Sequence, residues 1–407
     1  MNPKPEKLRP DKLEIGVLYG FRALMVLFVL NYHLWQQSWI SQHVVLFGRY
    51  ISFDFWTRSS YVFVDGMILL SGFLLYLPYA RQQAEGTPVP SAARFYFNRA
   101  ARILPSYLFA VLVALFCIAI PQGMYYSRGA MLHDVFAHLS FTFLFWPQTY
   151  ISTPLNVALW TIAVEMQFYL LFPLIAKAMR KKPAITAIVM MALAWLYRFC
   201  VTRFAQDTNI LINQMPAFLD VYALGMLGAI GYCRLRRWLE SAFRTEKGII
   251  GLASVVIFVV GLCALCDLLQ IQSTASIDGF ESLRLSQMRI RLPLVLTLGG
   301  MMFSAAFWPR ILQKLLDNRL MRFLSAISMN LYIWHQVLAV EMRKAWFPNT
   351  DLLHTDPNLQ SAYMLLCFCV AVLAAMAVTY GIEQPISRWL NRIWQNRRKP
   401  HERSQNG

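Results

Sequence analysis

Long apolar runs separated by short polar stretches recur along the whole chain. A helix needs about 20 mostly apolar residues to cross a bilayer. Ten runs approach that length, at residues 18–37, 61–80, 105–121, 159–177, 184–201, 216–233, 249–270, 291–308, 327–342 and 362–382. The pattern therefore predicts an all-α fold, a polytopic membrane bundle of about ten transmembrane helices.

The basic residues between these runs predict which ends of the helices face the cytoplasm. Lys and Arg concentrate in cytoplasmic loops of membrane proteins. With the amino terminus inside, 27 of the 38 basic residues fall in inner segments and nine in outer ones. A shorter run at 132–145 would put the basic block 180–182 on the wrong side if it crossed. We therefore predict that 132–145 is re-entrant or lies on the outer face, and that both termini are cytoplasmic.

Composition excludes a soluble domain and narrows the set of partners. The chain is 57% hydrophobic and 14% charged, whereas soluble domains carry about 25% charged residues. The net charge is +17. On a soluble protein such a charge would suggest that the protein binds nucleic acid, but here the basic residues lie at the ends of predicted membrane helices. We therefore predict a lipid bilayer and no nucleic acid as partner. The seven cysteines fall in or beside apolar runs and the histidines are scattered, so we predict no disulfide framework and no metal site.

The same pattern divides the chain into three parts. We predict a cytoplasmic amino-terminal segment at 1–17, a transmembrane domain at 18–385 and a basic cytoplasmic tail at 386–407. The segment before the first run is polar and is not followed by a cleavage site, so we expect the first helix to be retained as an anchor. The tail is expected to be disordered and close to anionic lipid.

The first run contains two residues that are costly in a bilayer, Arg22 and His33. Eleven positions at about 100° each make three turns plus roughly 20°, so both side chains project from one face, roughly 16 Å apart along the helix. Ionisable groups inside a membrane usually face a cavity or a partner. The pair therefore predicts a polar path between helices, although Arg22 could instead reach the headgroups while His33 makes a buried hydrogen bond.

Further ionisable residues fall in or beside other runs. Asp65 lies in the second run, where it could pair with Arg22 or His33, or form a structural ion pair that locks two helices. Arg99 and Arg102 share one face of a basic stretch that ends at Pro105, the expected start of the next span. These two arginines could bind phosphates or simply anchor the inner end of the helix.

Two later runs also carry polar groups. Glu165 lies inside a run, with Tyr169 one turn away. His335 lies in another run, and we interpret it as a buried core histidine. A second carboxyl group inside a span, after Asp65, strengthens the prediction of an interior polar cavity.

Together these segments resemble the acyltransferase 3 family of integral membrane acyltransferases. Arg22 and His33 are similar to its Arg-x10-His signature, and Arg99 to Pro105 is similar to its Arg-x-x-Arg-Ile-x-Pro segment. Two further segments carry the resemblance: Phe63-Val64-Asp65 with Leu70-Ser71-Gly72-Phe73, and Leu159-Trp160 through Val164-Glu165-Met166-Gln167-Phe168-Tyr169. Thr161 and Met166 depart from the usual Ser and Glu.

The resemblance implies an enzyme that moves an acyl group, usually acetyl, to a hydroxyl of an envelope carbohydrate or lipid-linked glycan. The implied co-substrate is acetyl-CoA or another acyl-CoA from the cytoplasm, with no tightly bound cofactor, and the implied location is the plasma (inner) membrane. A transporter or flippase, with these ionisable groups forming its path, and a ligand-sensing module are the competing classes.

The residues and the resemblance together suggest a division of roles. Arg22, Arg99 and Arg102 would hold the donor. His33 would be the general base, oriented by Asp65, with Glu165 in the same catalytic group. Direct transfer and a transient acyl-histidine both fit this arrangement.

Overall fold

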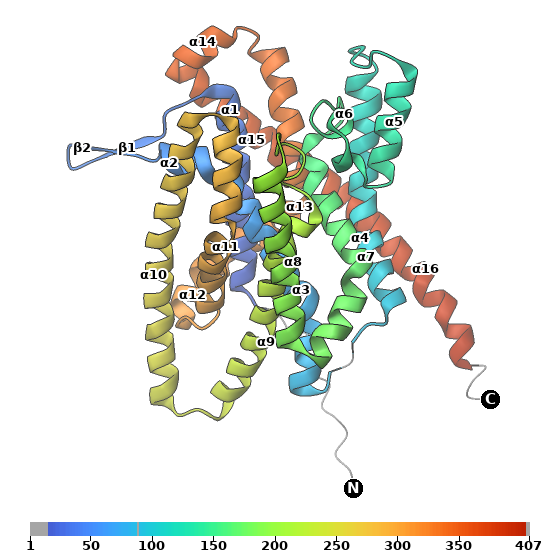
Figure 1. The fold of residues 1–407 in the computed structure, drawn as a ribbon, viewed down its shortest axis with the longest axis vertical. Coiled ribbons are helices and arrows are strands. Elements are labelled where there is room, and N and C mark those ends of the chain that lie inside the picture. Colours follow the sequence, from blue (N-terminus) through green and yellow to red (C-terminus); the bar gives the residue numbers. More distant parts are fainter. Residues whose placement is uncertain (1–14, 88, 404–407) are drawn as a thin grey trace.

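The computed structural model of the chain describes residues 15–87 and 89–403 (Figure 1). Its bundle consists of ten helices of at least 22 residues in this described part. They are α1 (Val17–Ser38), α3 (Phe63–Glu85), α4 (Ala92–Val113), α7 (Trp160–Lys181), α8 (Pro183–Phe204), α9 (Leu219–Ser241), α10 (Arg244–Ala275), α11 (Phe280–Ala305), α13 (Arg319–Trp346) and α15 (Pro357–Val378). Each of the ten predicted spans overlaps one of them, which confirms the all-α bundle.

Nine helical segments in the described part are long and apolar enough to cross a membrane. The tenth predicted span, 291–308, corresponds to α11, which is not among the nine. Its 26 residues are sufficient to cross, but they include Arg284, Arg289 and Arg291. Arg291, the first residue of that predicted span, is fully buried within α11.

Short elements gather at one end of the bundle, the upper end in Figure 1. They include the helices α2 (Asp54–Ser59), α5 (Arg128–Leu139), α6 (Pro147–Tyr150) and α14 (Thr350–Thr355), and a hairpin of β1 (His43–Leu46) and β2 (Arg49–Ser52). The 12 residues of α5 are too few to cross a bilayer, which agrees with the prediction that 132–145 does not span. The connection between α9 and α10 lies at the opposite end.

Two predictions about helix boundaries are wrong. Pro105 does not begin a span, because it lies inside α4, and the basic stretch before it belongs to the same helix. Ser91 caps that helix by accepting a hydrogen bond from the backbone N–H of Arg94. The tail is not disordered through Arg403, because α16 (Gln384–Arg403) continues α15 through the π-helical turn Thr379–Glu383. A short helix, α12 (Arg310–Leu316), precedes α13.

The domain boundaries and the cytoplasmic location of the termini stay predictions.

Helices α3 and α9 approach each other closely at two glycines. A β-carbon at Gly225 would lie 2.3 Å from the carbonyl oxygen of Leu69, and one at Gly72 would lie 2.8 Å from that of Tyr222. Such distances leave no room for a side chain, so only glycine allows this contact. Small residues permit close helix packing where lipid supplies no hydrophobic driving force. This contact fixes α3, which forms one wall of the cavity described next.

Candidate active site

A cavity of about 410 Å³ lies between α1, α3, α4, α7 and α13. Four of the six predicted site residues line it: Arg22, Arg99, Arg102 and Glu165. Arg102 is exposed, so the cavity opens at the end where α1 and α4 begin. Buried Thr161 and Tyr332 lie at the other end. The structure thus brings together arginines that lie some 80 residues apart in sequence.

Arg99 is prepared for an anionic ligand. Its guanidinium carbon lies 5.6 Å from the ring centre of Phe95 and 5.7 Å from that of Tyr169, so two aromatic faces hold it. Its Nε is buried and makes no hydrogen bond to any described residue. A buried donor without an acceptor is costly, and a phosphate or carboxylate entering the cavity would satisfy it.

Glu165 contributes the negative charge on the cavity wall. Its carboxylate accepts a hydrogen bond from the Tyr169 hydroxyl, at 2.8 Å. Arg102, Glu165 and Arg99 all act electrostatically on Arg22. A carboxylate among three arginines offsets part of their mutual repulsion and leaves a net positive cavity, which suits an anionic ligand.

His33 lies beyond the buried end of the cavity. Its Nδ1 lies 2.8 Å from Oε1 of Gln36, and its ring centre lies 4.9 Å from that of His335. His335 follows Tyr332 by one helical turn, and the two rings are 5.4 Å apart. A long ligand that fills the cavity from Arg102 to Tyr332 would therefore end near these two histidines.

Asp65 is placed away from this group. Its Oδ2 accepts a hydrogen bond of 3.1 Å from Nε of Arg291, and both side chains are buried. The predicted pairing of Asp65 with Arg22 or His33 is therefore wrong, and Gln36 contacts the imidazole instead. The structural alternative fits, because this ion pair joins α3 to α11. A catalytic role for Asp65 stays a prediction that no contact with His33 supports.

One wall of the cavity, a polar stripe on α13, was not recognised from the sequence. Ser325, Ser328, Tyr332 and His335 follow one another on one face of α13, and the first three line the cavity. Their spacing of three, four and three residues is the helical repeat, so this polar stripe was visible in the sequence. The described residues contain no group of three His, Cys, Asp or Glu side chains that could hold a metal ion.

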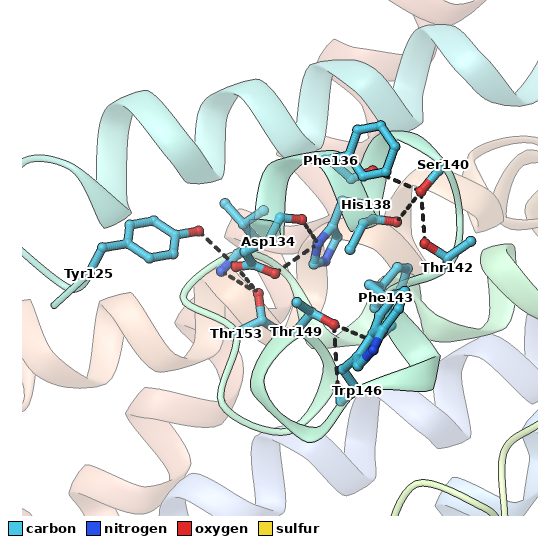
Figure 2. Close-up of polar contacts among 12 residues, drawn as sticks. Tyr125, Asp134, Phe136, His138, Ser140, Thr142, Phe143, Trp146, Thr149 and Thr153 are labelled. Carbon is cyan, nitrogen blue, oxygen red and sulfur yellow. Dashed lines mark hydrogen bonds and ion pairs between the residues drawn. The ribbon is translucent and has the colours of Figure 1, made fainter. Parts of the chain in front are cut away.

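A separate histidine site, away from His33 and His335, lies at the α5 end of the bundle, and we call it the α5 cluster (Figure 2). Its members are Tyr125, Asp134, His138, Phe143 and Thr153. The Asp134 carboxylate accepts hydrogen bonds of 2.7 Å from both the Tyr125 and Thr153 hydroxyls and lies 3.1 Å from Nδ1 of His138. The His138 ring stacks on Phe143, with centres 4.1 Å apart. Burial, and then the Asp134 carboxylate, raises the pKa of Tyr125, so its hydroxyl remains a donor.

The α5 cluster ties the cap formed by α5 and α6 to the bundle. The Tyr107 hydroxyl of α4 donates to the backbone carbonyl of His138, at 2.8 Å. Gln214 donates to the carbonyl of Leu144, at 2.7 Å. His138 is fully buried and does not line the 410 Å³ cavity. Its environment is that of a structural residue.

The arginine-lined cavity and the histidines beyond it lie inside a multi-pass helical membrane protein. A family model described as an acyltransferase domain matches residues 17–381. The chain therefore belongs to the acyltransferase 3 family.

Three relatives share parts of this sequence. Peptidoglycan O-acetyltransferase OatA of Listeria monocytogenes is 23% identical over 385 residues, which cover 91% of this chain and 55% of the relative. YrhL of Bacillus subtilis, provisionally named a peptidoglycan O-acetyltransferase, is 27% identical over 39% of this chain and 23% of its own length. A Staphylococcus aureus protein provisionally named O-acetyltransferase SACOL0978 is 26% identical over 39% of this chain and 24% of its own length. The chain spans about half the length of OatA. No solved structure matches it.

Proposed function

We propose that the chain is an O-acyltransferase of the plasma membrane that moves an acyl group, acetyl in the simplest case, from acyl-CoA to a hydroxyl of an envelope glycan. The observation that carries this proposal is the cavity itself. Three arginines line its open half, and His335 lies one helical turn beyond Tyr332 at its buried end. The Listeria relative, whose name states peptidoglycan O-acetylation, suggests peptidoglycan or a lipid-linked precursor as the acceptor.

The arginines would bind the phosphates of the donor. Arg102 meets the ligand at the exposed end, and Arg99 offers its unpaired Nε. Arg22, deeper on α1, would contact the pantetheine arm. Guanidinium groups suit this task because they stay charged and bind two oxygens at once.

His33 would then act on the acceptor. Its imidazole takes the proton from the acceptor hydroxyl while the oxygen attacks the thioester carbonyl. The new C–O bond forms, the C–S bond breaks, and the thiolate of CoA leaves and takes up the proton. General base catalysis of this kind contributes about 10²–10⁴-fold. Formation of an acyl-histidine before attack would use the same geometry.

The test is release of free thiol from acetyl-CoA by the purified protein, with and without an envelope glycan fraction. We expect acceptor-dependent release by the wild type. Thiol release that does not depend on the acceptor would contradict O-acyl transfer. A transporter or flippase, the second candidate, would release no thiol at all.

Donor binding is tested separately by thermal unfolding in detergent. Acetyl-CoA should raise Tm, because a ligand that binds the native state stabilises it by mass action. Arg99→Gln and Arg102→Gln should each weaken this shift and raise KM about tenfold, since one charged hydrogen bond is lost. Arg310→Gln removes an exposed arginine outside the cavity and is the matched control. Equal Tm shifts on addition of acetyl-CoA in all three variants would contradict the proposal that Arg99 and Arg102 bind the donor.

A further inference from the structure

His33 of α1 and His335 of α13 form a contact between two helices. Their ring centres are 4.9 Å apart and their planes are inclined by 52°. His335 is 1% exposed, and the titratable group that acts electrostatically on it is His33. Its burial agrees with the core histidine expected from the sequence. Nε2 of His335 is buried and has no hydrogen-bond partner in the described part of the chain, and the same is true of Nε2 of His138. His335 differs from His138 because it contacts a second imidazole and lies beside the cavity-lining Tyr332.

The contacts at Nδ1 fix the proton on each ring. Nδ1 of His335 lies 2.6 Å from the backbone carbonyl oxygen of Tyr332, which can only accept, so this nitrogen carries the hydrogen. Nδ1 of His33 lies 2.8 Å from Oε1 of Gln36 and donates to it in the same way. In the neutral rings, both lone pairs are therefore on Nε2.

The separation of the rings fits transfer of a proton between them. A hydrogen bond of about 2.9 Å between two imidazole nitrogens puts the ring centres roughly 5 Å apart. The observed 4.9 Å has that spacing, so rotation of the His33 ring, which releases its Nδ1–H from Gln36, would bring the two Nε2 atoms together while His335 keeps its bond to the Tyr332 carbonyl.

We propose that His335 is the second proton carrier of the reaction, which accepts at its Nε2 the proton that His33 takes from the acceptor hydroxyl. This inference rests on the proposed function. After the hydroxyl oxygen attacks the thioester, the proton moves from Nε2 of His33 to Nε2 of His335. His33 is again neutral, and the positive charge lies on a ring whose Nδ1–H is already bound to a carbonyl. The proton finally passes back through His33 to the departing thiolate, so both rings end neutral.

His335→Asn separates this role from a structural one. The asparagine amide can still donate to the Tyr332 carbonyl, as Nδ1–H does, but nothing replaces Nε2. We expect kcat to fall about 100-fold, with KM and Tm close to wild type. His335→Gln, which places an amide near the position of Nε2, should not restore kcat because an amide does not take up a proton. A kcat within about twofold of wild type for His335→Asn would overturn the proposal.

A double-mutant cycle tests whether the two histidines act in one step. If they do, His33→Ala with His335→Asn should be about as slow as His33→Ala alone, since residues that act as a unit are not additive. Independent roles would instead multiply the two losses. Wild-type protein without acceptor-dependent thiol release would contradict the proposed function and not the contact between the rings.

Nitrogen NMR of histidine-labelled protein tests that contact without turnover. We expect His335 to show a protonated Nδ1 and a bare Nε2, and the Nε2 signal to shift in His33→Ala but not in His133→Ala, which alters an exposed histidine of α5. An Nε2 signal that is the same in both variants, or a proton on Nε2, would rule out the relay.

Discussion

The protein contains two buried histidine sites that differ in what surrounds the ring. In the α5 cluster, His138 lies beside a carboxylate that receives two further hydroxyl donors, and an aromatic ring covers its face. In the membrane bundle, His33 contacts an amide and a second histidine next to the end of a cavity. The first arrangement resembles an Asp–His pair of an enzyme, yet it lies away from the cavity. The second lacks any carboxylate.

The two rings differ in their access to the cavity as well as in their neighbours. A carboxylate can orient an imidazole for catalysis or lock it into a fold. His138 is locked, because the cap around it is bonded to α4 and to the segment before α9. His33 instead contacts His335, whose ring lies 5.4 Å from that of the cavity-lining Tyr332.

The largest expected effect is that of His33→Ala on turnover. Loss of a general base should lower kcat by about 10²–10⁴-fold, and Tm should stay near wild type because the ring is only half-buried. Thiol release and thermal unfolding, measured on one preparation, test both statements. Equal turnover in His33→Ala and in the exposed-histidine control His133→Ala would contradict the proposal that His33 is the general base.

Asp134→Ala should have the next largest effect, on stability instead of turnover. It leaves the half-buried hydroxyls of Tyr125 and Thr153 without their acceptor, at a cost of about 1–3 kcal/mol, whereas Nδ1 of His138 keeps its 2.9 Å bond to the backbone carbonyl of residue 134. We expect a lower Tm in detergent and unchanged kcat at temperatures where the protein is folded. A normal Tm combined with lost turnover would move the catalytic centre to the α5 cluster.

Phe143→Leu should have the smallest effect and sharpens the same contrast. It removes a ring stacked on His138 with an angle of only 5° between the planes, while it keeps an apolar side chain in a buried position. Such stacking contributes about 0.5–1.5 kcal/mol beyond area burial. Tm should fall slightly and kcat should stay unchanged, and a larger loss than in Asp134→Ala would show that the carboxylate is not the centre of the cluster.

The sequence predicted what depends on one helix at a time. The ten spans, the shared face of Arg22 and His33, and the pairing of Glu165 with Tyr169 all follow from length or helical spacing. These features depend on the residues of one helix and not on the helices packed against it, so the sequence alone predicts them.

What the sequence could not supply was which helices meet. Asp65 was free to pair with any buried cation, and only the packing of α3 on α11 selects Arg291 over His33. His335 looked like a core residue because its partner lies some 300 positions away on α1. Arg291 is the first residue of the predicted run 291–308, and only the packing of the helices shows that its side chain is buried against Asp65.

Helix α1, which carries both Arg22 and His33, also sets a length for the donor. Roughly 16 Å of helix separates the two side chains, so in the proposed reaction the reactive carbonyl must lie about that far from the part of the donor that Arg22 contacts, and its phosphates lie farther away still. Acetyl phosphate, whose phosphate is bonded directly to the acyl group, is too short to occupy both ends. The protein would thus select acyl donors by the length of the molecule before the reactivity of the acyl group matters.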